Sequence, residues 1–205
     1  MALLAEVVTV GDVFVDVGAN RGFFAIPLAK LVGSSGRILA FEPAVDTAEQ
    51  LRVRARAEGL LGRITIHELA LGSEDGSGVL RGDPDQPEDS TKRSLVISDG
   101  LAVAEVPIRS FDGLVDSRAI DLSSGLHAVK IDVEGAEMHV LSGMRRSLQR
   151  HRPRMVVVET IEGHLRRAGA TVSDVHSFMR DLGYAAMPDR KIPKPLELNA
   201  VFVPV

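Results

Sequence analysis

The chain has 205 residues, 45% of them apolar and 25% charged, which is typical of a globular protein with a single domain over residues 1–205. It contains no cysteine, and this excludes disulfides, thiolate metal sites and cysteine nucleophiles. A net charge of -4, with one Tyr and no Trp, argues against a nucleic-acid partner, which would need basic and stacking side chains. No run approaches the roughly 20 apolar residues of a membrane span and no signal peptide is recognisable, so we expect a cytoplasmic protein without a membrane partner.

Apolar runs alternate with helical patterns along the chain. The helical spacing predicts helices over residues 23–32, 46–57 and 173–182. The apolar runs predict strands over residues 13–17, 38–41, 64–67, 128–133, 155–158 and 200–205. This alternation predicts an α/β fold in which helices cover both faces of a parallel sheet. The runs at 13–17, 128–133 and 155–158 are apolar almost throughout, as expected of central strands.

Residues 72–100 interrupt this alternation. The segments GSEDGSG and GDPDQPEDS are rich in turn-forming residues and too polar for a core, so we expect a surface excursion. Its second part, residues 83–100, begins with prolines and acids and continues with Leu95, Val96 and Ile97. We expect residues 83–100 to be either a mobile lid over a binding site or an inert loop.

The sequence DVGANRG, residues 16–22, lies between the first strand and the first helix, where open α/β sheets bind ligands. A dinucleotide fingerprint would need glycine at positions 20 and 23, which are Asn and Phe here. Asp16 would repel a pyrophosphate, but it suits S-adenosylmethionine, which carries an ammonium and a sulfonium. Gly18 and Gly22 permit close backbone approach, and Asn20 suits a tight turn. Other nucleotides and a turn without a ligand remain alternatives at this point.

The ends of the second and third strands add candidate cofactor contacts. Glu42 closes the second strand twenty positions after Gly22, where a carboxylate can accept both ribose hydroxyls. Pro43 follows it and is placed to form one wall of an adenine slot. After the third strand, Ala70 can offer its backbone amide to the adenine edge. An ordinary surface acid and a plain strand exit are the alternatives.

The sequence KIDVEGAE, residues 130–137, places charges in an otherwise apolar strand, where they are costly unless paired. Lys130 and Asp132 share one face by the two-residue period. Asp132 and Glu134 fall at the carboxyl end of this strand, and Glu159 ends the next strand at the same edge. Such acids can orient an amino group, accept a proton or bind a divalent cation, although an acid near a helix N-terminus also complements the helix dipole.

The motifs DVGANRG, AFEP, ALGS, VKIDVEGAE and VVVE, in this order within residues 12–162, resemble those of the FkbM-type family of S-adenosylmethionine-dependent methyltransferases. The resemblance implies a three-layer Rossmann-like class I methyltransferase fold, with a seven-stranded, mostly parallel sheet and an antiparallel last strand. It implies methylation of a hydroxyl on a small-molecule acceptor, such as a sugar or a secondary metabolite. It also implies that Asp16, Gly18, Asn20 and Glu42 bind the cofactor, that Asp132 lies near its methionine moiety, and that Glu134 and Glu159 face the acceptor.

The catalytic hypothesis concerns the acids after the fourth and fifth predicted strands. We expect Glu134 or Glu159 to act as base or to orient the acceptor, with Asp132 serving mainly the cofactor. No histidine or carboxylate pair has the spacing of a dedicated cation site, so we expect no metal. His164 is either an active-site residue or a surface residue.

Several alternatives stay open. Small-molecule amines could replace the hydroxyl, whereas the absence of an Asn/Asp-Pro-Pro-aromatic signature disfavours a nucleobase amine. A nicotinamide-dependent oxidoreductase is disfavoured by Asp16, by Asn20 and by the absence of a Tyr-x-x-x-Lys pair. A binding module without catalysis is a third alternative, and a homodimer is possible.

Overall fold

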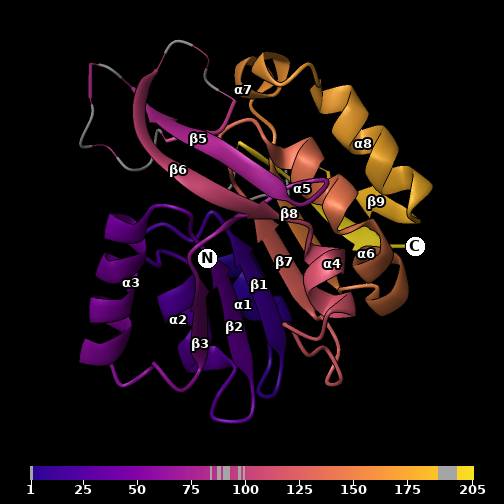
Figure 1. Ribbon diagram of the computed structural model, residues 1–205. Helices are drawn as coiled ribbons and strands as arrows, with labels where there is room; N and C mark the ends of the chain where they lie inside the picture. Colours follow the sequence, from indigo (N-terminus) through magenta and orange to yellow (C-terminus); the bar gives the residue numbers. More distant parts are fainter. Residues whose placement is uncertain are drawn as a thin grey trace.

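A seven-stranded sheet forms the centre of the molecule (Figure 1). The computed structural model describes residues 2–188, apart from 84, 87, 88, 90–92, 97 and 99, and residues 198–205. The strands of this sheet, in spatial order, are β3 (Ile64–His67), β2 (Arg37–Phe41), β1 (Val13–Val17), β7 (Ala128–Ile131), β8 (Met155–Glu159), β10 (Asn199–Pro204) and β9 (Tyr184–Ala186). The first five pair in parallel, and β10 is antiparallel to both of its neighbours. The predicted mostly parallel sheet with an antiparallel last strand is confirmed.

The central strands β1, β7 and β8 are buried throughout, as their apolar sequences predict. Strand β7 ends at Ile131, two residues before the predicted end at position 133. The reason is the backbone of Glu134 and Gly135, which have φ of 56° and 113° and therefore turn the chain away from the sheet. Asp132 and Glu134 consequently lie on a loop at the sheet edge.

Helices cover both faces of the sheet and complete three layers (Figure 1). One core contains side chains of α1 (Ala2–Val7), α2 (Ala25–Leu31) and α3 (Val45–Ala57) together with Phe14 of β1. The other contains Val15 of β1 and side chains of α4 (Phe111–Asp116), α5 (Glu137–Gly143), α6 (Arg145–His151), α7 (Glu162–Arg167) and α8 (Val172–Asp181). Adjacent residues of a strand point to opposite faces, so these two cores lie on opposite sides of the sheet.

A second, three-stranded sheet corrects the prediction that residues 72–100 are only a polar surface excursion. It contains β4 (Ala70–Leu71), β6 (Leu101–Arg109) and β5 (Gly76–Gly82) in that order, and β5 and β6 pass above the large sheet in Figure 1. Leu80 and Val106 are buried in a small core with Ala44 and Ala70. The polar composition concealed β5 because most of its residues are exposed or only partly buried.

The segment 93–96 rests on this small sheet. Ser94 and Arg81 exchange two backbone hydrogen bonds, of 2.8 and 2.9 Å. Residues 84, 87, 88, 90–92, 97 and 99 of the expected lid lie outside the described residues, and the lid therefore stays a prediction. Within the part of the chain that the structure describes, no helix combines the length and apolar character needed to cross a bilayer.

Candidate active site

Two loops that are far apart in the sequence meet at the carboxyl ends of β1 and β7. Gly18 has φ of 74°, and a Cβ at this position would overlap the carbonyl oxygen of Asp132. Only glycine permits this approach without displacing the second loop. Asn20, with φ of 48°, forms the tight turn expected of it. The DVGANRG and KIDVEGAE motifs therefore form one continuous edge of the site.

Glu42, after β2, is buried beside the first of these loops. Its Oε2 accepts a hydrogen bond from the backbone N–H of Asn20 at 2.9 Å, and its Oε1 accepts one from that of Ala44 at 3.0 Å. Burial raises the pKa of Glu42, and these two amides oppose the shift. The carboxylate is thus fixed in position, with the remaining lone pairs of its oxygens available to ligand hydroxyls.

A cavity of about 430 Å³ opens at this edge, within the size range of small-molecule sites. The residues predicted from the sequence that line it are Gly18, Asn20, Glu42, Pro43, Ala70, Asp132 and Glu134. Asp16, Gly22 and Glu159 do not line it. A Cβ on Gly22 would overlap Leu51, so this glycine is required by packing against α3.

The donor set of the cavity fits S-adenosylmethionine. A fixed carboxylate, Glu42, suits the ribose hydroxyls, and the backbone of Gly18 leaves the cavity open where a side chain would fill it. Asp132 adds a carboxylate to the lining, which suits an ammonium group, and one of its oxygens, Oδ2, binds Lys130 at 2.8 Å. These residues would bind the ribose and the methionine moiety, respectively.

Lys130 of β7 and Asp132 of the following loop form an ion pair. Lys130 is buried, and its Nζ lies 2.8 Å from Oδ2 of Asp132 and 4.7 Å from the centre of the Phe24 ring. Asp16, on the neighbouring strand, is fully buried. Burial raises the pKa of Asp16 to about 6, and the positive charge of Lys130 opposes this rise. Lys130 therefore compensates part of the negative charge at this edge, which is what the shared face of residues 130 and 132 predicted.

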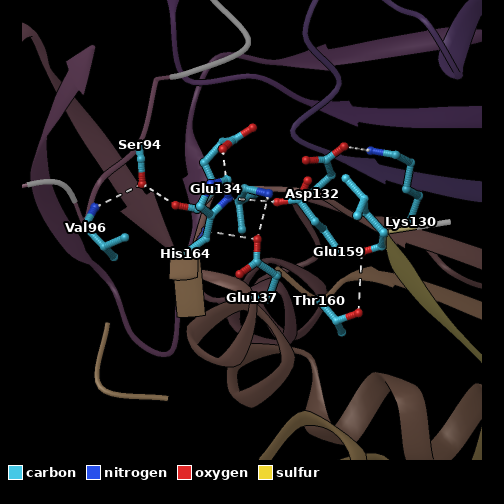
Figure 2. A network of polar contacts seen from close by, with 12 residues as sticks. Ser94, Val96, Lys130, Asp132, Glu134, Glu137, Glu159, Thr160 and His164 are labelled. Carbon is cyan, nitrogen blue, oxygen red and sulfur yellow. Dashed lines mark hydrogen bonds and ion pairs between the residues drawn. The ribbon is translucent and has the colours of Figure 1, made fainter. Parts of the chain in front are cut away.

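Glu134 and Glu159 meet at a third residue, His164 at the start of α7 (Figure 2). His164 Nδ1 lies 3.1 Å from Oε2 of Glu134 and 3.4 Å from Oε2 of Glu159. The sequence left His164 open between the active site and the surface. The structure places it in contact with both predicted catalytic acids, because the loop after β8 returns α7 to the sheet edge.

Burial and neighbouring charges shift the pKa values of Glu134, Glu159 and His164. Burial, followed by the charges of Asp132 and Glu137, raises the pKa of Glu134 to about 7. Burial and the surrounding acids raise the pKa of Glu159 to about 9. Burial lowers the pKa of His164, with Arg167 acting in the same direction. These shifts favour the protonated form of Glu159 and the neutral form of His164, and they bring the titration of Glu134 close to neutral pH.

One atom each from Glu134, Glu159 and His164 lie within 4.8 Å of one another, a separation that could also accommodate a divalent cation. Glu159 and His164 are five residues apart, but Glu134 comes from the distant loop after β7, so no single short motif in the sequence contains the set. The expectation that no metal takes part stays a prediction.

Two residues at the site, Ser94 and Arg93, lie outside the sequence motifs and were not predicted from the sequence. Ser94 is buried, and its Oγ donates a hydrogen bond to the carbonyl of Glu134 at 2.8 Å. Arg93 lines the cavity and lies 2.7 Å from Oδ1 of Asp46. Both belong to the excursion between β5 and β6, where the sequence has no periodicity that indicates contact with the site.

The fold and the site define a class I methyltransferase. A family model described as "Methyltransferase FkbM domain" matches residues 16–186. The chain belongs to the FkbM methyltransferase family, and its cofactor is S-adenosylmethionine.

Two curated relatives are similar over part of their length. "Methyltransferase 1" of Beauveria bassiana is 30% identical over 144 residues, which cover 63% of this chain and 57% of the relative. "Hexuronic acid methyltransferase AglP" of Haloferax volcanii is 30% identical over 148 residues, covering 72% of this chain and 56% of the relative. The chain spans about half the length of the curated relatives it matches.

A solved structure supports the fold assignment. The FkbM methyltransferase of Methylobacillus flagellatus superimposes with a TM-score of 0.59 at 19% identity, over 94% of this chain and 43% of that one. At this identity the similarity concerns the fold alone.

Proposed function

We propose that the protein transfers a methyl group to a hydroxyl of a small molecule. The observation that carries this proposal is the contact between Glu134, which lines the cofactor cavity, and His164 Nδ1 at 3.1 Å. Through this contact, Glu134 is held in the cavity as a proton-accepting group beside the expected methyl donor. A hydroxyl is a weak nucleophile and needs such a group.

The proposed cofactor contacts follow the two loops. Glu42 binds the ribose hydroxyls, Pro43 and Ala70 border the adenine, and Asp132 faces the methionine moiety. Gly18 and Asn20 shape the backbone between these groups. Asp16 and Gly22 act from outside the cavity, through charge and packing. When bound, S-adenosylmethionine supplies an electrophilic methyl carbon on a sulfonium sulfur.

The two acids of the cluster have different proposed roles. Glu134, with a pKa of about 7, accepts the proton that leaves the acceptor oxygen as the new O–C bond forms and the S–C bond breaks. Glu159, with a pKa of about 9, is protonated near neutral pH and is better suited to orient His164 or the acceptor. The contacts of His164 Nδ1 with Glu134 and Glu159, at 3.1 and 3.4 Å, orient the ring.

We infer a sugar as the acceptor class. Carboxylates and a histidine are suitable partners for several neighbouring hydroxyls, and one relative is described as acting on a hexuronic acid. An amine is the second candidate, because Asp132 and Glu134 both line the cavity and an ionised carboxylate there would attract an ammonium group.

The test combines binding and product analysis. Calorimetry with S-adenosylmethionine and with NAD separates a methyltransferase from an oxidoreductase. Methyl-labelled cofactor is then incubated with methyl glucoside, glucuronic acid and glucosamine, and NMR of the products distinguishes O-methyl from N-methyl groups. An O-methyl product is expected. N-methylglucosamine alone would favour the amine, and cofactor binding without a product would overturn the sugar assignment.

A further inference from the structure

The turn that carries Glu134 packs against two segments. A Cβ on Gly135 would approach the carbonyl oxygen of His164 to 2.6 Å and Cγ2 of Val96 to 2.8 Å. Both α7 and the segment 93–96 therefore contact this turn. Glu134 itself has a left-handed backbone, which is unfavourable for a residue with a side chain and persists only where neighbouring groups fix it.

Both polar groups of the peptide that joins Glu134 to Gly135 have partners (Figure 2). The carbonyl of Glu134 accepts the hydrogen bond from Ser94 Oγ at 2.8 Å. The N–H of Gly135 donates to Oε1 of Glu137 at 3.1 Å, and that same oxygen accepts from the N–H of Val133 at 3.1 Å. Rotation of this peptide would break the first two bonds together.

Ser94 is itself rigidly placed. Its backbone is bonded in both directions to Arg81 of β5, and its Oγ accepts the N–H of Val96 at 3.2 Å, which leaves the hydroxyl proton for Glu134. The side chain is buried, so water does not readily replace it. The Ser94 hydroxyl thereby connects the small sheet to the turn after β7, next to the packing contact of Val96 with Gly135.

We propose that Ser94 is a positioning residue for methyl transfer: with Glu137, it fixes the peptide between Glu134 and Gly135 and so directs the Glu134 carboxylate toward His164 and the cavity. This inference rests on the proposed function of Glu134 as proton acceptor. It assigns a role to the excursion between β5 and β6, which contains none of the family motifs.

Hydrogen exchange of backbone amides tests whether Ser94 fixes the peptide between Glu134 and Gly135, and it needs no methyl-acceptor substrate. In Ser94→Ala, the Gly135 amide should exchange about tenfold faster, because the peptide loses one of its two partners. Ser77→Ala is the matched control, since it removes an exposed hydroxyl from the same sheet that bonds Glu105 at 2.9 Å. Equal exchange at Gly135 in Ser94→Ala and wild type would overturn the proposal. If Ser94→Ala lowers the melting temperature strongly, Ser94→Cys replaces it, because it keeps the side-chain size with a weaker donor.

Turnover tests the functional part, using whichever of methyl glucoside, glucuronic acid or glucosamine is methylated. Ser94→Ala should lower kcat about tenfold in the wild-type background, with the Kd of S-adenosylmethionine unchanged. In a Glu134→Gln background it should lower kcat less than twofold, because the group it positions is already gone. The same loss in both backgrounds would overturn the positioning role. Unchanged turnover in Glu134→Gln alone would instead contradict the proposed function, which keeps the two failures distinguishable.

Discussion

Gly18 and Asp132 touch across the sheet edge: the Cα of the glycine lies so close to the aspartate carbonyl that no Cβ fits between them. The contact joins the loop after β1 to the loop after β7, which are neighbouring parallel strands. It fixes the distance between the DVGANRG loop and the loop that carries Asp132 and Glu134.

The first prediction concerns this contact. Gly18→Ala should abolish measurable S-adenosylmethionine binding and lower the melting temperature, because the new methyl group must displace the Asp132 loop. Gly169→Ala is the control: its φ of 75° is nearly the same as the 74° of Gly18, but no atom lies within 4 Å of its added Cβ. It should cost only the backbone strain, about 1–2 kcal/mol of unfolding free energy, and preserve binding. Equal effects in the two variants would show that strain alone matters.

The second prediction concerns Glu42. Glu42→Ala should weaken S-adenosylmethionine binding tens-fold or more, because two charge-assisted hydrogen bonds to ribose contribute about 1.5–3 kcal/mol each. Calorimetry measures the Kd directly. Glu68→Ala serves as the control, since Glu68 is partly exposed and pairs with Arg52 outside the cavity. Undiminished affinity in Glu42→Ala would remove this residue from the site.

The third prediction concerns the pH dependence of kcat. Glu134 must be ionised to accept a proton, and its pKa is raised to about 7, so kcat should increase as pH rises through 7 and then level off. Glu134→Gln should lower kcat about a hundredfold and remove this dependence. A profile of unchanged shape in the variant would assign the titration to another group.

The fourth prediction concerns stability. The pKa of Glu159 is about 9 in the folded protein against an ordinary value of 4.5, so the folded state binds the proton more tightly than the unfolded state does. The contribution is fully favourable below pH 4.5 and is lost as pH rises from there toward 9. Glu159→Gln should therefore raise the melting temperature relative to wild type at pH 8, with a smaller difference at pH 4. A difference that does not change with pH would contradict the shifted titration.

The fifth prediction concerns metal dependence. Turnover should survive excess chelator, because the contacts of His164 Nδ1 with Glu134 and Glu159 already account for the geometry of this cluster. The measurement compares kcat with chelator and with added Mg²⁺, Mn²⁺ or Zn²⁺. Loss of turnover on chelation, with recovery on addition of one of these ions, would show that a cation occupies the cluster.

The sequence by itself determined most strands of the large sheet and the part of the cavity lining that carries its motifs, namely Gly18, Asn20, Glu42, Pro43, Ala70, Asp132 and Glu134. Buried parallel strands need near-continuous apolar runs, and their carboxyl ends meet at one edge, so Glu42, Asp132 and Glu159 had to approach the same region. The sequence was sufficient for this prediction because each motif directly follows a strand, and the carboxyl ends of neighbouring parallel strands lie together.

Only the tertiary structure decided which side chains touch. His164 reaches Glu134 and Glu159 through the path of the chain after β8. Ser94 reaches Glu134 from the segment between β5 and β6, which shows no strand or helix periodicity in the sequence. The raised pKa values of Glu134 and Glu159 likewise come from burial and from charges on separate segments. These contacts depend on packing between elements distant in the sequence, and no local pattern of residues encodes the distance between them.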